Sequence, residues 1–251
     1  MEPLTQTRIE EIAHLTVGQR DNPLWLEMRK ARLTASNFGR VWTASQSGRA
    51  NLDTLRSDIT GGRDLSRIPA VKWGVDHEQK AIKTYEELTG YRVEETGIWL
   101  FPDGHMGASP DGLVRDREGV LVGILEVKCP WSVRNLPPET GLYKLPYIEH
   151  YPPALVKKHA YYHQVQGELA ATNLPWCDFF VWTPRKTLTV RVYPDETWKT
   201  TTLPSIKSLY LDKVRLPEAE SSTVNSARLN AQECQEALTE YGSLHLRNKN
   251  F

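Results

Sequence analysis

The sequence predicts an α/β protein with a central mixed β-sheet flanked by helices. Apolar residues recur with helical spacing in residues 71–90 and 157–172, and the first of these segments ends at Gly90, a typical helix terminator. Five strand-like runs lie between and after these helices, in residues 91–102, 105–116, 120–130, 177–183 and 187–194. Helical and strand-like segments that interleave along one chain are typical of a sheet covered by helices.

The other elements follow in chain order. Residues 4–14 predict a short helix, and residues 25–32 predict a second helix that breaks and restarts with Thr34 or Ser36 as its N-cap. Residues 43–70 predict loops around one weak helix, and residues 91–130 predict a meander of three strands. Residues 195–214 predict a closing helix that Pro204 bends or splits. We expect one domain in residues 1–216 and a polar tail in residues 217–251, either helical or disordered.

Composition limits the class of protein. Lys plus Arg and Asp plus Glu both count 31, so a nucleic-acid partner has to meet a local basic patch rather than a global positive field. The three cysteines form no CxxC pair, which argues against a disulfide scaffold and against a thiolate zinc site. No run approaches the roughly 18 apolar residues of a membrane span, and the N-terminus has no apolar signal region. We therefore expect an intracellular, soluble protein of the cytoplasm or nucleus, neither secreted nor membrane-bound.

Two charges on one apolar strand indicate chemistry. Glu126 and Lys128 lie two residues apart in the run "VLVGILEVK", so both side chains leave the same face of the strand. Asp111 comes shortly before, between Pro110 and Gly112. Two carboxylates are hard oxygen ligands for Mg²⁺, and a lysine, unlike an arginine, can give up a proton to assist an attacking water. This set suits a metal-dependent phosphodiesterase.

The alternative is an ordinary surface hairpin in which Glu126 and Lys128 form a weak exposed ion pair. The apolar flanking residues Ile124, Leu125 and Val127 argue against it, because a half-exposed hairpin of this composition is a poor host for solvated charges.

Five short blocks extend this pattern: "WLEMRKARLTAS", "WGVDHE", "GASPDGLV", "LEVKCP" and "HQVQGELA". In this order they resemble the lambda-type phage exonucleases and the YqaJ-like viral recombinase nucleases of the PD-(D/E)xK superfamily, over about residues 22–185. The resemblance implies a restriction-endonuclease-like core and a nuclease with two Mg²⁺ ions per site, for which Mn²⁺ can substitute. It implies digestion of one strand of linear double-stranded DNA from a 5′-phosphorylated end, in recombination or repair. A homotrimer and a single-strand annealing protein are the further partners it suggests.

The resemblance also assigns roles to residues. Asp111, Glu126 and the backbone carbonyl of Val127 would hold the metals, with Glu78 as the helical glutamate, and Lys128 would orient or activate the water. Glu78 shares a helical face with Tyr85, which directs it toward the core, although an acid in a helix's first turn can simply favour the helix dipole.

Gln164 matches the glutamine of the family's active-site helix, from which it could reach Lys128 or the water. Gln166 is the alternative, and the resemblance favours Gln164. His159 and His163 are expected to be packing or polar-face residues, and Tyr161 lies either at the edge of the site or in the core.

A 5′-phosphate pocket is implied at Arg29, Ser36 and Ser109. A guanidinium fork and a hydroxyl near a helix start suit an anion, although Ser36 could merely cap a helix and Arg29 could be solvated. Candidates for contacts with the DNA backbone, each of which could instead serve solubility, are Lys30, Arg32, Tyr161, Lys157, Lys158, Arg185 and Lys186.

Two other functions remain open from the sequence. One is an endonuclease or RNA-directed nuclease of the same superfamily, against which the phosphate-pocket residues argue. The other is a non-catalytic DNA-binding relative, against which the presence of Asp111, Glu126 and Lys128 argues. Residues 43–70 and 132–153 fall where the family varies, so oligomerisation and DNA handling can differ here.

Overall fold

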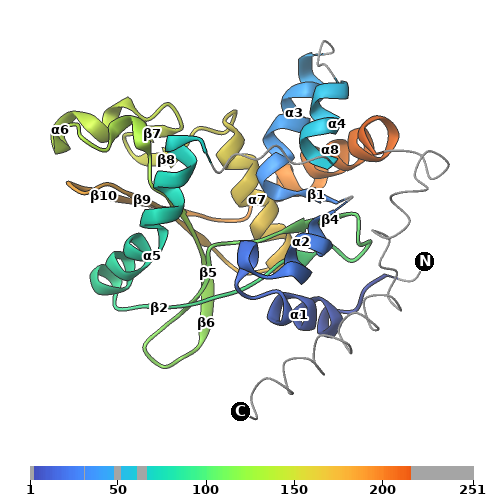
Figure 1. The fold of residues 1–251 in the computed structure, drawn as a ribbon, viewed down its shortest axis with the longest axis horizontal. Coiled ribbons are helices and arrows are strands. Elements are labelled where there is room, and N and C mark those ends of the chain that lie inside the picture. The colour runs from blue at the N-terminus through green and yellow to red at the C-terminus, as the bar shows by residue number, and fades with distance from the viewer. Residues whose placement is uncertain (1–2, 31, 48–51, 61–66, 216–251) are drawn as a thin grey trace.

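Five strands form the central sheet in the order β10-β9-β6-β5-β2 (Figure 1). They are β2 (Arg92–Glu94), β5 (Gly112–Arg115), β6 (Leu121–Lys128), β9 (Cys177–Trp182) and β10 (Thr187–Val192). The pair β6 and β9 is parallel and the other pairs are antiparallel, so the sheet is mixed, as predicted. The computed structural model describes residues 3–30, 32–47, 52–60 and 67–215.

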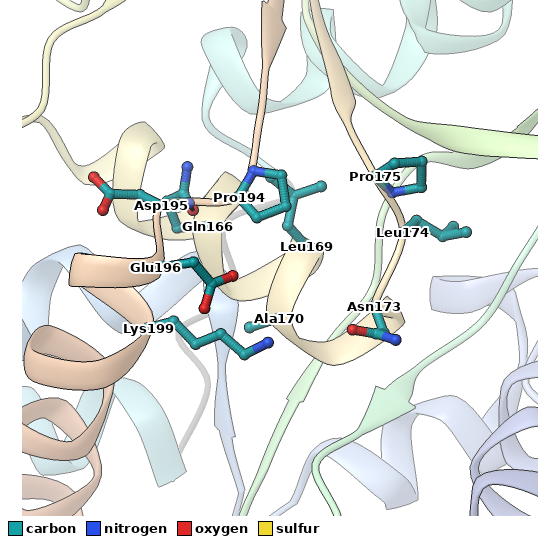
Figure 2. Close-up of a pocket in the computed structure, with 10 residues that line it drawn as sticks. All are labelled: Gln166, Leu169, Ala170, Asn173, Leu174, Pro175, Pro194, Asp195, Glu196 and Lys199. Atoms are coloured by element: carbon teal, nitrogen blue, oxygen red, sulfur yellow. Dashed lines mark hydrogen bonds between the residues drawn. The ribbon is translucent and has the colours of Figure 1, made fainter.

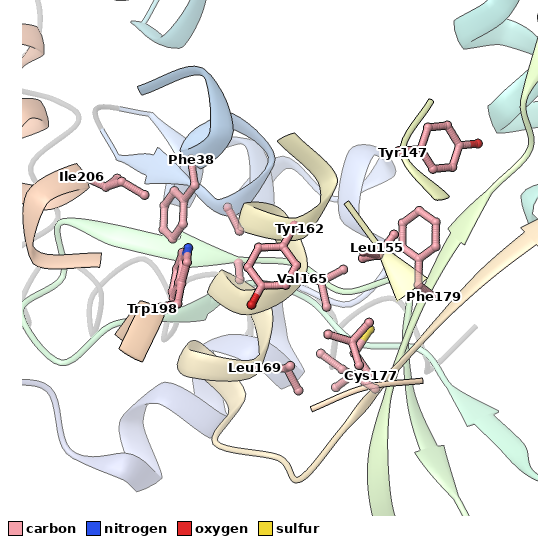
Figure 3. Packing of buried hydrophobic residues seen from close by; sticks show 14 of the residues in the cluster. Phe38, Tyr147, Leu155, Tyr162, Val165, Leu169, Cys177, Phe179, Trp198 and Ile206 are labelled. Carbon is pink, nitrogen blue, oxygen red and sulfur yellow. The ribbon is translucent and has the colours of Figure 1, made fainter. Parts of the chain in front are cut away.

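Two helices cover the two faces of this sheet. Because side chains alternate along a strand, Leu125 faces α5 (Pro69–Thr89) and packs with Tyr85, whereas Ile124 faces the other way. On that second face Ile124 joins the cluster built around α7 (Ala160–Thr172), and Figure 3 shows Val165 and Phe179 within it. Helix α7 begins within the expected 157–172 segment, and α5 ends before Gly90, whose φ of 73° is left-handed.

A second, three-stranded sheet has the order β1-β4-β3. Its strands are β1 (Leu33–Thr34), β3 (Trp99–Leu100) and β4 (Met106–Ala108). The prediction of a plain three-stranded meander over residues 91–130 is therefore wrong, since residues 91–102 and 105–116 each break and contribute a strand to both sheets. The first break occurs where Gly97 donates its N–H to Ala13 of α1, and the second at Pro110, which has no N–H for a ladder.

The segment of residues 3–60 is mostly helical in its described parts. It contains α1 (Gln6–Leu15), the 3₁₀ turn η1 (Gln19–Asp21), α2 (Pro23–Arg29), η2 (Ala35–Asn37), α3 (Phe38–Ser47) and α4 (Leu52–Thr60). Helix α2 ends three residues before the predicted end at residue 32. Residues 43–47 are helical rather than loop, because α3 packs tightly on α7: a Cβ on Gly39 would lie 2.4 Å from the Cα of Ala160.

Short elements fill the connection after β6: η3 (Trp131–Val133), α6 (Pro138–Gly141), η4 (Leu142–Lys144), β7 (Ile148–His150) and β8 (Pro153–Leu155). The closing helical segment contains the π-helical turns η5 (Trp198–Thr202) and η6 (Tyr210–Val214) on either side of α8 (Leu203–Leu209), with Pro204 in the first turn of α8. The backbone at Thr202 and Leu203 is helical, so the segment is not split at Pro204. The expected tail from residue 217 lies outside the described residues. Among the described helices, none combines the length and the hydrophobicity needed to cross a membrane.

Candidate active site

The two sheet-borne carboxylates face each other across the β5–β6 hairpin. The antiparallel register pairs Gly112 with Leu125, so the next pair outward sets Asp111 opposite Glu126. The N–H of Asp111 donates to the carbonyl of Leu125 at 3.0 Å, and the N–H of Val127 donates to Oδ2 of Asp111 at 2.6 Å. The hairpin thus fixes both the backbone and the carboxylate of Asp111.

Glu126 is buried, with 1% of its surface exposed. One carboxylate oxygen accepts hydrogen bonds from the Lys128 ammonium and, at 2.6 Å, from the Gln164 amide on α7. The other oxygen, Oε2, is buried without a partner among the described residues. A buried carboxylate oxygen that lacks a donor is costly, which indicates that this position suits a further ligand.

Lys128 is the cation of this cluster. Burial lowers the pKa of Lys128, but the carboxylates of Glu126 and Asp111 outweigh burial and raise that pKa above its ordinary value. Its Nζ also lies 4.8 Å from the ring centroid of Tyr161, so Tyr161 borders the site while its ring packs against Tyr147.

Glu78 approaches the same cluster from α5. Burial and the charge of Glu126 raise the pKa of Glu78, whereas Arg20, 3.1 Å away, opposes the rise. Burial and then Glu126 likewise raise the pKa of Asp111. The expectation that Glu78 lies in a first helical turn is wrong, because α5 begins at Pro69, more than two turns earlier. An effect of the helix dipole, which fades within one turn, therefore does not account for this glutamate.

Gln164 faces the cluster and Gln166 does not. The Gln164 Nε2 donates to Glu126 and, at 2.9 Å, to Oε1 of Glu168, one turn further along α7. Gln166 instead bonds the backbone of Tyr193 and Asp195, and it lines a pocket of about 180 Å³ whose lining includes none of Glu78, Asp111 and Glu126 (Figure 2). Glu168 is a residue that sequence reasoning missed. Its only signal is its i+4 spacing from Gln164.

The connection between α1 and α2 adds two further residues that the sequence did not single out. Arg20 pairs with Glu78, and the side chain of Gln19 donates to the backbone carbonyls of Thr96 and Pro110. The neighbouring Gly18 indicates a turn. Nothing in the sequence connects that turn with Thr96 and Pro110, which follow Gln19 by 77 and 91 positions.

Arg29 and Ser109 are joined through Trp25, which sequence reasoning also missed. The guanidinium of Arg29 lies 4.2 Å from the Trp25 ring centroid, and the indole N–H donates to the Ser109 hydroxyl at 2.9 Å. Arg29 pairs with no carboxylate in the described part of the chain, and burial lowers its pKa to about 10. A half-buried guanidinium without an anionic partner suits an anionic ligand.

Ser36 lies at the same end of the smaller sheet. The parallel strands β1 and β4 pair Thr34 with Gly107. Two residues further along each chain segment lie Ser36, in η2, and Ser109, just after β4. Thr34, one of the two expected N-cap residues, is the N-cap of η2, but its side chain makes no capping hydrogen bond and its hydroxyl contacts that of Ser36 at 3.1 Å. Ser36 is exposed, so its hydroxyl is accessible.

The candidates for backbone contacts differ in exposure. Arg32 is buried and donates to the carbonyls of Met28 and Gly104, which disfavours a contact with DNA. Lys30 pairs with Glu27 and Lys157 with Asp195, both at the surface. Three further candidates for contacts with the DNA backbone are exposed: Lys158, Arg185 and Lys186.

The two histidines of α7 have structural contacts. His159 is the N-cap, and its ring accepts from the N–H of Tyr161 at 3.2 Å. His163 is buried and accepts from the indole N–H of Trp198 at 2.9 Å.

The donor set of the cluster fits a divalent cation. Glu78, Asp111 and Glu126 supply hard oxygen donors, the charge of Glu126 raises the pKa of both Glu78 and Asp111, and Glu126 has an unpartnered oxygen. Within the described residues no three carboxylate, imidazole or thiolate groups already converge at metal-binding spacing. Instead, the positive charge beside Glu126 comes from the Lys128 ammonium, which contacts it directly.

Solved structures show the same fold. The alkaline exonuclease of Laribacter hongkongensis in complex with dAMP aligns with a TM-score of 0.59 and 27% identity, over 78% of this chain and 92% of that chain. The Shutoff and Exonuclease Protein of Kaposi's sarcoma-associated herpesvirus aligns with a TM-score of 0.53 over 82% and 72% of the two chains, and at 13% identity it bears on the fold alone. The expected restriction-endonuclease-like core is therefore confirmed.

Sequence comparison gives the same relationship. The alkaline nuclease of Autographa californica nuclear polyhedrosis virus is 25% identical over 222 residues, which cover 78% of this chain and 49% of the viral protein. The chain thus spans about half the length of that relative. The model of the YqaJ-like viral recombinase domain matches residues 24–175, more than half of the chain. The resemblance seen in the sequence is thereby confirmed, and the chain belongs to the YqaJ-like viral recombinase domain family.

Proposed function

We propose that this protein is a metal-dependent deoxyribonuclease that digests one strand of linear double-stranded DNA from a 5′-phosphorylated end, in recombination or repair. One observation carries the proposal: Asp111, whose carboxylate lies in the Glu126–Lys128 cluster, is two residues from Ser109, which Trp25 joins to Arg29. A hydrolytic cluster and an anion site with an unpaired guanidinium therefore lie side by side.

The chain's own groups would divide the work. Glu78, Asp111, Glu126 and the carbonyl of Val127 would hold divalent metal, Mg²⁺ or in its place Mn²⁺. When bound, such ions lower the pKa of water and stabilise the charge that develops on a phosphodiester. Lys128 would orient the attacking water or take part in moving its proton, and the Gln164 amide would keep Glu126 in place.

Arg29, Ser36 and Ser109 would bind the terminal phosphate. Arg29 offers a permanently charged fork, and the two serine hydroxyls lie at the same end of the paired strands β1 and β4. Lys30, Lys157 and Lys158 remain candidates for the DNA backbone.

The relatives support this assignment at the level of their names, which are those of an alkaline nuclease and an alkaline exonuclease, the latter bound to a deoxynucleotide. A non-catalytic DNA-binding role is disfavoured, because Lys128 contacts Glu126 and the hairpin register sets Asp111 opposite Glu126. A homotrimer and a single-strand annealing partner stay predictions of the family resemblance.

A substrate comparison tests the proposal. We expect Mg²⁺-dependent loss of linear duplex DNA, faster with a 5′-phosphate than with a 5′-hydroxyl, and no loss of covalently closed circles. Glu126→Gln should abolish digestion, whereas Glu149→Gln, at an exposed position on β7, should not. Cleavage of closed circles would reject the exonuclease assignment.

A further inference from the structure

Gln19 has a backbone conformation that its side chain disfavours. Its φ is 44°, in the left-handed region, and it follows Gly18 at 88°. In the described part of the chain, Asn173 is the other non-glycine residue with positive φ. Asn173 ends α7, where a short amide side chain tolerates this conformation well. A longer glutamine gains no such local relief, so contacts elsewhere have to hold it there.

Those contacts come from its side-chain amide. The Nε2 group donates to the carbonyl of Pro110 at 2.9 Å and to the carbonyl of Thr96 at 3.1 Å. Pro110 and Thr96 are both buried, and buried carbonyls require donors. Both amide hydrogens are thus used, and one of them anchors the peptide that leads directly into Asp111.

The turn itself is well anchored. The side-chain amide of Asn22 donates to the carbonyls of Leu15 at 2.9 Å and Val17 at 2.8 Å, and its oxygen accepts from the N–H of Leu24 at the start of α2. Gln19 therefore extends from a backbone that is tied to both α1 and α2.

Three successive residues before β5 are each held by a different element. Trp25 of α2 donates to Ser109, Gln19 donates to Pro110, and Val127 of β6 donates to Asp111. Strand β6 holds the N–H and the carboxylate of Asp111. Gln19 holds the carbonyl oxygen of the same Pro110–Asp111 peptide, so it fixes the side of the backbone that β6 does not contact.

We infer that Gln19, which lies outside the family-matched residues, is a positioning residue of the candidate active site and fixes the backbone that carries Asp111. The inference rests on the proposed metal-binding role of Asp111. Loss of the amide would leave the carboxylate in place but less well oriented.

Two variants distinguish the contribution of the Gln19 side-chain amide from that of its unfavourable backbone φ. Gln19→Ala removes the amide and keeps the unfavourable φ, whereas Gln19→Gly removes the amide and relieves the φ. Asn173→Gly is the matched control, since it relieves the other positive φ of the described residues at the end of α7, nine residues and roughly 13 Å along the helix from Gln164. The measurements are the affinity for Mn²⁺ alone by calorimetry, kcat and KM on linear duplex DNA, and the melting temperature.

We expect both Gln19 variants to lose about ten- to hundred-fold in Mn²⁺ affinity and in kcat, as changes behind metal ligands do. KM for DNA should stay within about two-fold of the wild-type value, and Gln19→Gly should melt no lower than Gln19→Ala. Asn173→Gly should keep wild-type Mn²⁺ affinity and kcat.

Wild-type Mn²⁺ affinity and kcat in both Gln19 variants would overturn the inference. So would recovery of both quantities in Gln19→Gly, because the residue would then act through its backbone only, and so would a wild type that binds no Mn²⁺. A wild type that binds Mn²⁺ but leaves linear DNA intact would reject the exonuclease proposal alone, and the Mn²⁺ titration would still decide the role of Gln19.

Discussion

The indole N–H of Trp25 donates a hydrogen bond to the hydroxyl of Ser109 at 2.9 Å, although 84 residues separate them in the chain. The same ring lies beneath the guanidinium of Arg29. One tryptophan therefore orients two of the three residues that we assign to the terminal phosphate.

Trp25→Phe should weaken the preference for a 5′-phosphate. The phenyl ring still supports Arg29, but the hydroxyl of Ser109 loses its donor, and a hydrogen bond is worth about 1 kcal/mol net, or about five-fold. Digestion rates on duplexes with a 5′-phosphate and a 5′-hydroxyl measure the effect. Trp176→Phe alters a ring beneath Arg191 in the hydrophobic cluster of Tyr85 and Leu125, to which Trp25 does not belong, so it should leave the preference unchanged. An unchanged preference in Trp25→Phe would contradict this role.

Lys128→Arg should fold but lose most of its activity. The guanidinium keeps a positive charge beside Glu126, so the buried carboxylate stays paired, but arginine does not give up a proton. We expect kcat to fall by about 10²- to 10⁴-fold, the range for loss of general acid–base assistance, with a nearly unchanged melting temperature. Single-turnover rates at saturating enzyme measure this fall. Wild-type rates in this variant, or in Lys128→Ala, would exclude a proton-transfer role.

Gln164→Leu and Gln166→Leu form a matched pair on one helix. Gln164 contacts Glu126, so its loss should lower kcat by about ten-fold, because one donor to a buried carboxylate is removed. Gln166 bonds backbone groups of Tyr193 and Asp195, so its loss should lower the free energy of unfolding by about 1–3 kcal/mol and leave kcat per folded molecule unchanged. Urea unfolding and steady-state kinetics on both variants separate the two effects. If instead Gln166→Leu lowered kcat and Gln164→Leu lowered only the free energy of unfolding, Gln166 rather than Gln164 would belong to the active site.

Stability should fall in acid because of His163. Burial lowers the pKa of His163 to about 4, whereas the unfolded chain protonates near the ordinary value of about 6.5. The unfolded state therefore binds the proton first, so the stabilisation is complete above about pH 6.5 and is lost as the pH falls toward 4. The difference amounts to about 3 kcal/mol.

The comparison of wild type with His163→Gln isolates this contribution. Glutamine can accept the Trp198 N–H but does not titrate, so the variant should lose less stability than the wild type between pH 7 and pH 4.5. Urea unfolding at the two pH values provides the measurement. Parallel losses in both proteins would show that His163 titrates normally.

Local pattern was sufficient to predict the carboxylate hairpin. Asp111 and Glu126 meet because a short antiparallel connection sets their register, and Lys128 follows from strand alternation. The expected segment 71–90 starts within two residues of the start of α5, but Glu78 was placed in its first turn because the apolar spacing is clear only from Ala81 onward. The contacts of Gln19 and Trp25 could not be predicted, since they depend on how α1 and α2 pack against loops at least 77 residues away. The change of sheet at Pro110 likewise depends on tertiary packing.

That change of sheet has a consequence for the products of digestion. Strands β4 and β5 belong to different sheets and are joined only by residues 109–111, so Ser109 and Asp111 lie two positions apart, at most about 7 Å along the backbone. Under the proposed roles, this short link sets the distance between the bound terminal phosphate and the bond that is cut. Because the link is short, the bond that is cut would lie close to the bound terminal phosphate. This favours release of one nucleotide at a time over release of longer fragments.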